Sequence, residues 1–101
     1  MIGCKIKWVF EDYSPNEKID WKEVKEKCYG KYFYKSKLYN NSRNAKKYAL
    51  KLFLIADEKT EKFTLIIKGN LDKWYSQKPL NRNLTLEEYQ NCIKLLLLEI
   101  E

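Results

Sequence analysis

The strongest constraint on the fold is a pair of apolar segments that flank a short polar linker. KYALKLFLIA precedes the linker DEKTE, and KFTLIIK follows it. Two apolar runs joined by a few polar residues predict a β-hairpin, because the linker supplies the turn between two strands. The first run also fits a helical stripe, so residues 43–56 are open to a helical alternative. That stripe consists of Ala45, Tyr48, Ala49, Leu52, Phe53 and Ala56.

Two further segments alternate between successive positions as a half-buried strand does. In residues 4–12, Lys5 and Lys7 stand between apolar neighbours. Residues 31–39, KYFYKSKLY, alternate in the same way. As a strand, this segment directs one set of side chains to one face: Tyr32, Tyr34, Ser36 and Leu38. The opposite face then carries Lys31, Phe33, Lys35, Lys37 and Tyr39.

Helix-start signals occur twice in the sequence. Asp20 and Glu23 have the spacing of a capping box before residues 21–29, and Gly30 is placed to end that helix. Thr85 and Glu88 form a second capping box before LEEYQNCIKLLLLEIE, whose last residues also fit a strand. Between the helices, the turn-rich residues 69–84 contain one expected helical turn over residues 72–76.

The expected element order is β-α-β-β-β-α, which predicts an α+β fold. A two-layer arrangement with an antiparallel sheet of about four strands and two helices satisfies this order. A chain of 101 residues matches one domain, so we expect residues 1–101 to form a single domain.

The charge distribution points to one contact surface. Residues 27–51 contain eight positive side chains and no carboxylate, whereas the other 76 residues carry 12 positive and 14 negative ones. Of the 20 basic residues, 18 are lysines, and lysine is a point-charge binder rather than a bidentate reader of base edges. The segment therefore favours an acidic partner over base-specific recognition.

Several chemistries are disfavoured by what the chain contains. There is no histidine, and the three glycines are too far apart to form a phosphate-binding loop. We expect no cofactor, no metal and no catalytic residues, and the three cysteines, Cys4, Cys28 and Cys92, are expected to be buried. A divalent-metal nuclease is the enzymatic alternative, because carboxylates occur in pairs. Those pairs are Glu11 with Asp12, Asp57 with Glu58, and Glu87 with Glu88.

The localisation expected from the sequence is cytoplasmic, without membrane contact. No apolar run approaches the ~20 residues that cross a bilayer. Lysines also interrupt the N-terminal segment where a signal peptide is apolar.

The predicted function is that of a small non-catalytic binding protein. Its basic, aromatic surface is expected to contact nucleic acid directly or a nucleic-acid-handling protein, and both alternatives stay open at this point. A second alternative is structural, with lysines solvating a strand whose Tyr32, Tyr34, Leu38 and Tyr48 face the core. The candidate contact residues are Lys31, Phe33, Lys35, Lys37, Tyr39, Arg43, Lys46 and Lys47. Trp74 and Tyr75 either anchor a partner from an exposed loop or pack against the sheet.

Two resemblances accompany this expectation. The element order over residues 20–98 is similar to that of the double-stranded RNA-binding domain, although the start of the last helix, TLEEYQ, is acidic where that family has a lysine cluster. The size and the lysine- and tyrosine-rich composition resemble those of phage or mobile-element proteins from AT-rich bacteria. Such proteins often inhibit host defence nucleases stoichiometrically, including CRISPR effectors, which implies an anti-CRISPR-like role.

Overall fold

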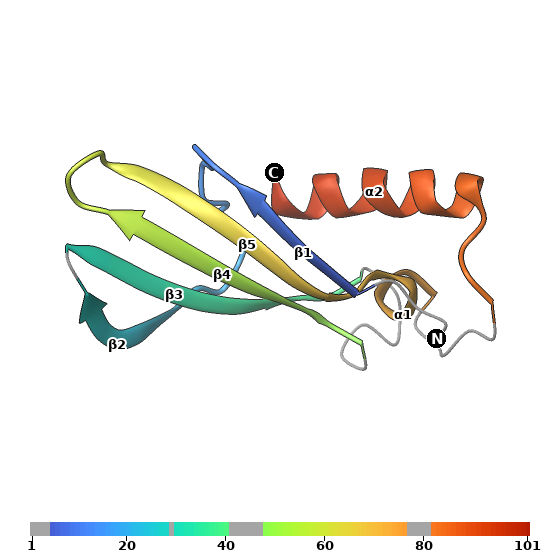
Figure 1. Ribbon diagram of the computed structural model, residues 1–101, viewed down its shortest axis with the longest axis horizontal. Helices are drawn as coiled ribbons and strands as arrows, with labels where there is room; N and C mark the ends of the chain where they lie inside the picture. The colour runs from blue at the N-terminus through green and yellow to red at the C-terminus, as the bar shows by residue number, and fades with distance from the viewer. Residues whose placement is uncertain (1–4, 29, 41–47, 77–81) are drawn as a thin grey trace.

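The computed structural model describes residues 5–28, 30–40, 48–76 and 82–101, which form an antiparallel sheet and two helices (Figure 1). The predicted α+β class is confirmed, and the sheet has five strands, slightly more than predicted. The strands are β1 (Lys5–Phe10), β2 (Lys22–Cys28), β3 (Lys31–Leu38), β4 (Leu50–Asp57) and β5 (Lys62–Asn70). The helices are α1 (Leu71–Ser76) and α2 (Leu86–Ile100).

Strands β4 and β5 form the predicted hairpin. Their register runs from the Lys51–Lys68 pair to the Asp57–Lys62 pair, next to the turn. The Glu61 backbone N–H donates to the Asp57 carbonyl at 2.9 Å and closes that turn. Every second residue of β4 from Leu50 to Leu54 is buried, which is the strand period. The helical alternative is therefore wrong for residues 50–56.

Residues 22–28 form strand β2, so the helix predicted over residues 21–29 is wrong. Asp20 and Glu23 imitate the spacing of a capping box, but pairing with β3 supplies the backbone hydrogen bonds instead. Gly30 has a φ of 75° in the turn between β2 and β3, a conformation that glycine adopts without steric cost. Loss of this helix also removes the likeness to the double-stranded RNA-binding domain.

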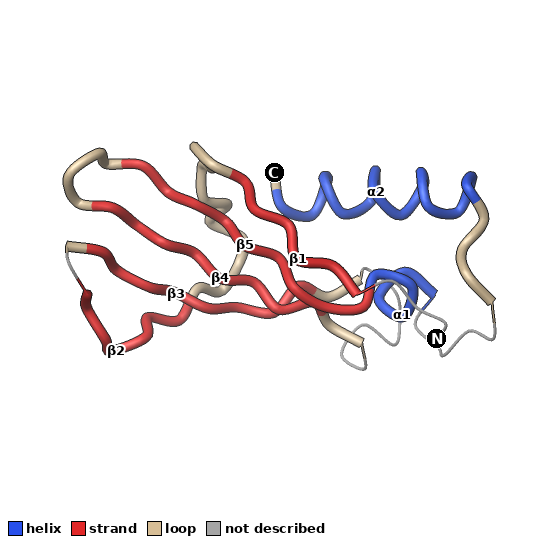
Figure 2. The backbone as a smooth tube through the Cα atoms, in the orientation of Figure 1, coloured by secondary structure: helices blue, strands red, loops and turns tan. Residues whose placement is uncertain are grey.

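The strand order is β1-β5-β4-β3-β2, so β1 and β2 lie at opposite edges of the sheet (Figure 2). The connection between them, residues 11–21, therefore has to cross the sheet. It crosses on the helix side, because the Tyr13 hydroxyl donates to the Ile100 carbonyl and the Asn16 side chain donates to the Glu101 carbonyl. This connection and both helices thus occupy one face.

Helix α2 begins at the predicted capping box. The Glu88 backbone N–H donates to Thr85 Oγ1 at 3.2 Å, and the Thr85 N–H donates to Glu88 Oε1 at 3.0 Å. The helix continues to Ile100, so the strand alternative for its last residues is wrong. Helix α1 matches the short helical turn predicted over residues 72–76.

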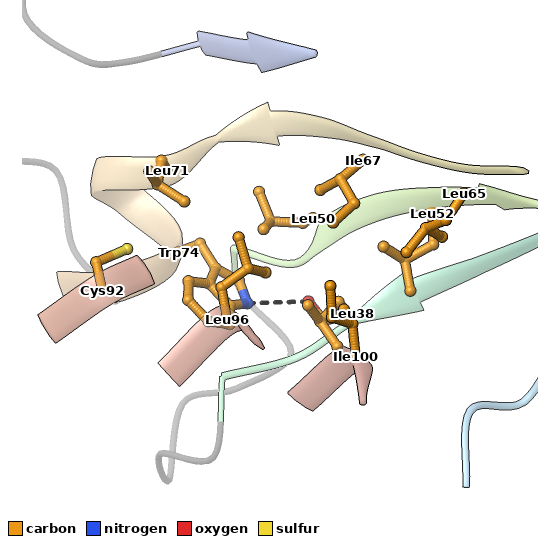
Figure 3. Close-up of a cluster of buried hydrophobic side chains, with 10 residues drawn as sticks. All are labelled: Leu38, Leu50, Leu52, Leu65, Ile67, Leu71, Trp74, Cys92, Leu96 and Ile100. Carbon is orange, nitrogen blue, oxygen red and sulfur yellow. Dashed lines mark hydrogen bonds between the residues drawn. The ribbon is translucent and has the colours of Figure 1, made fainter. Parts of the chain in front are cut away.

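The core lies between the sheet and the two helices (Figure 3). The Trp74 Nε1–H donates to the Leu38 carbonyl at 3.1 Å, which fastens α1 to the end of β3. At Gly69 a Cβ atom would lie 2.7 Å from Leu50 Cδ2, so a larger residue would displace this fully buried side chain. The fully buried side chains are Leu50, Leu52, Leu65, Ile67, Leu71, Trp74, Cys92 and Leu96.

Candidate nucleic-acid interface

Every lysine of β1, β3, β4 and β5 lies on the sheet face opposite the helices. Residues paired across strands share a face, and alternate residues of a strand point to opposite faces, so the register decides this placement. We call this surface the open face. Its lysines, all exposed, are Lys5, Lys7, Lys31, Lys35, Lys37, Lys51, Lys62 and Lys68. Lys22 of β2 joins them, because it pairs with Lys35.

Four of these lysines form a row across four neighbouring strands. Lys7 in β1 pairs with Lys68 in β5, which in turn pairs with Lys51 in β4. Lys51 also pairs with Lys37 in β3. Adjacent strands lie about 4.8 Å apart, so this row spans roughly 14 Å. We call Lys7, Lys68, Lys51 and Lys37 the basic row.

The basic row is unfavourable for folding on its own. Like charges directly opposite each other on neighbouring strands repel, and this row contains three such pairs in succession. Asp57 is the sole carboxylate among the open-face residues that are paired with a neighbouring strand. It lies at the other end of β4, between Lys31 and Lys62. The row therefore favours a negatively charged ligand, which would relieve the repulsion.

Apolar side chains lie beside the basic row on the same face. Phe53 pairs with Ile66 of β5, and Phe33 of the next strand pairs with Ile55. Both phenylalanines are half-buried, and Lys68 Nζ lies 5.4 Å from the centroid of the Phe53 ring. We call these residues the apolar band: Val9, Val24, Phe33, Phe53, Ile55 and Ile66.

The structure places part of the predicted contact set together. Lys31, Phe33, Lys35 and Lys37 share the open face of β3, as the alternation predicted. Tyr39 follows that strand and is 42% exposed. Arg43, Lys46 and Lys47 lie outside the described residues.

Four residues of the open face are not among the contact residues predicted from the sequence. Lys7, Lys51, Lys68 and Phe53 come from three different strands, and only the strand order brings them beside β3. The alternation around Lys5 and Lys7 is a local signal for their face. The pairing of β1 with β5 has no comparable local signal.

The structure corrects two expectations about aromatic residues. Trp74 is fully buried, and Tyr75 is partly buried against the core. The two residues therefore pack inside the protein, and the alternative that they anchor a partner from an exposed loop is wrong. Leu38 is buried as expected, and Tyr32 and Tyr34 share its face of β3, as the alternation predicted. Tyr32, Tyr34 and Tyr48 are half-buried rather than buried. Of the three cysteines expected to be buried, Cys92 is buried and forms no disulfide. Cys4 and the side chain of Cys28 lie outside the described part of the structure.

A groove of about 1170 Å³ continues from the end of the basic row to the C-terminal end of α2. Lys37, Lys51 and Phe53 line it on the open-face side, and Leu98 and Glu99 line it on the helix side. Lys18, Lys22 and Lys35 add further positive charge. The groove has mixed charge, so it extends the basic surface without forming a purely cationic pocket.

The carboxylate pairs occupy turns and a helix start. Asp12 lies 3.3 Å from Lys62 Nζ, and Asp57 Oδ1 accepts the Lys59 backbone N–H at 2.9 Å. The Tyr32 hydroxyl donates to Glu58. Within the described ranges, no group of three or more cysteine, aspartate or glutamate side chains is arranged to hold a metal ion.

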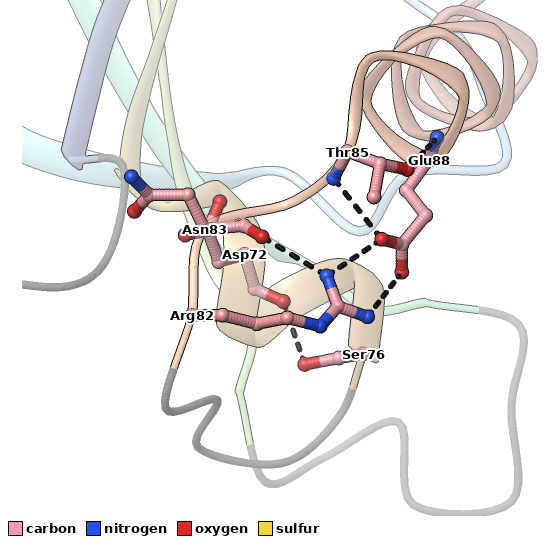
Figure 4. A network of polar contacts seen from close by, with 6 residues as sticks. All are labelled: Asp72, Ser76, Arg82, Asn83, Thr85 and Glu88. Atoms are coloured by element: carbon pink, nitrogen blue, oxygen red, sulfur yellow. Dashed lines mark hydrogen bonds and ion pairs between the residues drawn. The ribbon is translucent and has the colours of Figure 1, made fainter.

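A polar network fixes the start of α2 (Figure 4). The Arg82 guanidinium donates to both carboxylate oxygens of Glu88, at 2.7 and 3.2 Å. These hydrogen bonds, together with that from the Thr85 backbone, lower the pKa of Glu88 to about 2. The same pair raises the pKa of Arg82. The network stabilises the helix start and lies outside the open face.

Neither described helix has the length and apolar character required to span a membrane. Comparison with protein-family models, curated proteins and solved structures gives no match for this chain.

Proposed function

We propose that this protein binds nucleic acid, without catalysis, through the open face of its sheet. The observation that carries the proposal is the basic row, which aligns four exposed lysines on four strands. Lysines that contact phosphates release condensed counterions, and this release drives sequence-independent binding. The near absence of arginine on the chain agrees with binding that does not read base edges.

An acidic surface on a nucleic-acid-handling protein is the second candidate ligand. Tyr39 favours it, because an exposed tyrosine next to a charged surface is a common interface anchor and this one is 42% exposed. A stoichiometric inhibitor of a defence nuclease belongs to this second class. In both cases the basic row supplies the electrostatic attraction, so variants of the row test both.

The experiment compares two double variants with equal charge loss. Lys51→Gln/Lys68→Gln removes half of the basic row, and Lys59→Gln/Lys94→Gln removes two exposed lysines from the β4–β5 turn and from α2. Binding of labelled single-stranded and duplex DNA and RNA is measured by fluorescence anisotropy at several salt concentrations. Each phosphate contact contributes about −0.7 to −0.9 to the slope of log K against log salt.

The row variant should bind at least about tenfold more weakly at low salt, and its salt slope should be shallower by about 1.5. The control variant should stay close to wild type in both quantities. The row variant should also be at least as stable as wild type, because the substitutions remove repulsion between paired lysines. Equal losses in the two variants would contradict the proposal. Absence of binding to every nucleic acid at low salt would leave the acidic protein as the ligand.

A further inference from the structure

Over β1, β5 and β4, the open face carries lysines in one row and apolar residues in the next. The basic row is followed along the strands by Val9, Ile66 and Phe53, a row that Lys35 and Lys22 continue across β3 and β2. Ile55 and Phe33 lie in the row after that. Same-face residues of one strand lie about 7 Å apart, so each row is displaced from the previous one by that distance. The face therefore presents the four lysines of the basic row along one line, and beside it, over β1, β5 and β4, a parallel apolar line that ends at Lys35 on β3.

A single nucleic-acid strand has the same two-sided chemistry. Its phosphates lie along one side, and its unpaired bases offer flat apolar surfaces on the other. In a duplex the bases stack and pair with each other, so an aromatic row beside the phosphates gains nothing from them. A purely electrostatic ligand would likewise use the basic row and leave the apolar band unused.

The separation of the Phe33 and Phe53 rings suits two successive bases of a single strand. Phe33 pairs with Ile55, which is two residues from Phe53 on the same face, so the rings are diagonal neighbours on adjacent strands. Diagonal neighbours lie about 7–8 Å apart, a distance that an extended single strand bridges between successive bases. In the unbound protein Lys68 Nζ lies 5.4 Å from the Phe53 ring centroid. A base that stacks on Phe53 would displace this ammonium group towards a phosphate.

We infer that the ligand is a single strand that crosses the β-strands at a steep angle. Its phosphates follow the basic row from β1 to β3, and its bases stack on Phe53 and Phe33. This inference rests on the proposed function and adds the strand state of the ligand and its path. A row of roughly 14 Å matches a few phosphates, so the minimal site is about four to eight nucleotides, at the short end of the range for small sheet folds.

The test uses Phe33→Leu/Phe53→Leu, which keeps apolar side chains on the open face but removes both aromatic rings. The matched control is Ile55→Leu/Ile66→Leu, which changes shape at neighbouring positions of the same band. Affinities are measured for oligo-dT, oligo-U and a DNA duplex, each of about ten residues, at one fixed salt concentration. Thermal melting of each variant verifies folding before the titrations.

Wild type should bind the single strands at least about tenfold more tightly than the duplex. The phenylalanine variant should lose about fivefold to a hundredfold in single-strand affinity, while its salt slope and its duplex affinity stay unchanged. The isoleucine variant should match wild type. Duplex binding as tight as single-strand binding, or an unchanged single-strand affinity without the two rings, would overturn the inference.

Failure of this inference is distinguishable from failure of the proposed function. If Lys51→Gln/Lys68→Gln weakens binding but Phe33→Leu/Phe53→Leu does not, the open face is a general polyanion surface and the stacking path is wrong. If heparin or polyphosphate competes as well per charge as oligo-dT, the same conclusion follows. If no nucleic acid binds at low salt, both the path and the proposed function are wrong.

Discussion

Two tryptophans at the core, Trp74 and Trp21, differ in whether the indole N–H forms a hydrogen bond. Trp74 is fully buried and donates its Nε1–H to the Leu38 carbonyl at 3.1 Å. Trp21 also packs against the core, but its buried Nε1 has no hydrogen-bond partner among the described residues. An unpaired buried donor costs free energy, whereas a paired one contributes to stability. The two residues therefore form a natural comparison.

Trp74→Phe should destabilise the protein by about 1–3 kcal/mol more than Trp21→Phe. Both substitutions remove the same ring atoms, but only the first breaks a hydrogen bond and opens a cavity at a fully buried position. Urea denaturation monitored by far-UV circular dichroism measures the free energy of unfolding of each variant. A cost at Trp21 equal to or larger than that at Trp74 would contradict the assigned roles.

At the scale of elements, the predictable parts have local signals. The capping box at Thr85 and Glu88 specifies the start of α2, and two apolar runs around a polar turn specify β4 and β5. The sequence predicts a helix where strand β2 forms, because Asp20 and Glu23 have the spacing of a capping box. Most residues of β2 are charged, so its conformation depends on pairing with β3 rather than on its own pattern.

The start of α2 should lose stability in acid. The folded-state pKa of Glu88 is lowered to about 2 from an ordinary value near 4.5, so folding favours the carboxylate. This contribution is fully present above about pH 4.5, and it is lost as the pH falls from there towards about 2.

The melting temperature measured from pH 6 to pH 2 should therefore fall less steeply for Glu88→Gln than for wild type below about pH 4.5. Glu87→Gln is the matched control, because Glu87 lies in the same helical turn without the bidentate Arg82 contact. It should retain the steeper fall. Identical pH profiles for wild type and Glu88→Gln would show that the Arg82 pair does not contribute.

At the scale of the whole molecule, topology creates the candidate site. The connection over residues 11–21 and both helices share one face, which leaves the strand lysines together on the other. The face of Lys35 and Lys37 could be predicted from alternation within β3. The alignment of Lys7, Lys68, Lys51 and Lys37 could not, because it depends on β1 pairing with a strand more than fifty residues later in the chain.

Contact between the basic row and a nucleic-acid ligand can be measured directly at each lysine. Amine-reactive labelling of the protein with and without a saturating single-stranded oligonucleotide, read by mass spectrometry, reports on all exposed lysines in one experiment. If the basic row contacts the ligand, Lys7, Lys37, Lys51 and Lys68 should become protected, while Lys59 and Lys94, on the turn and on α2, should label as in the free protein. Protection spread evenly over all lysines, or strongest at Lys59 and Lys94, would contradict contact through the basic row.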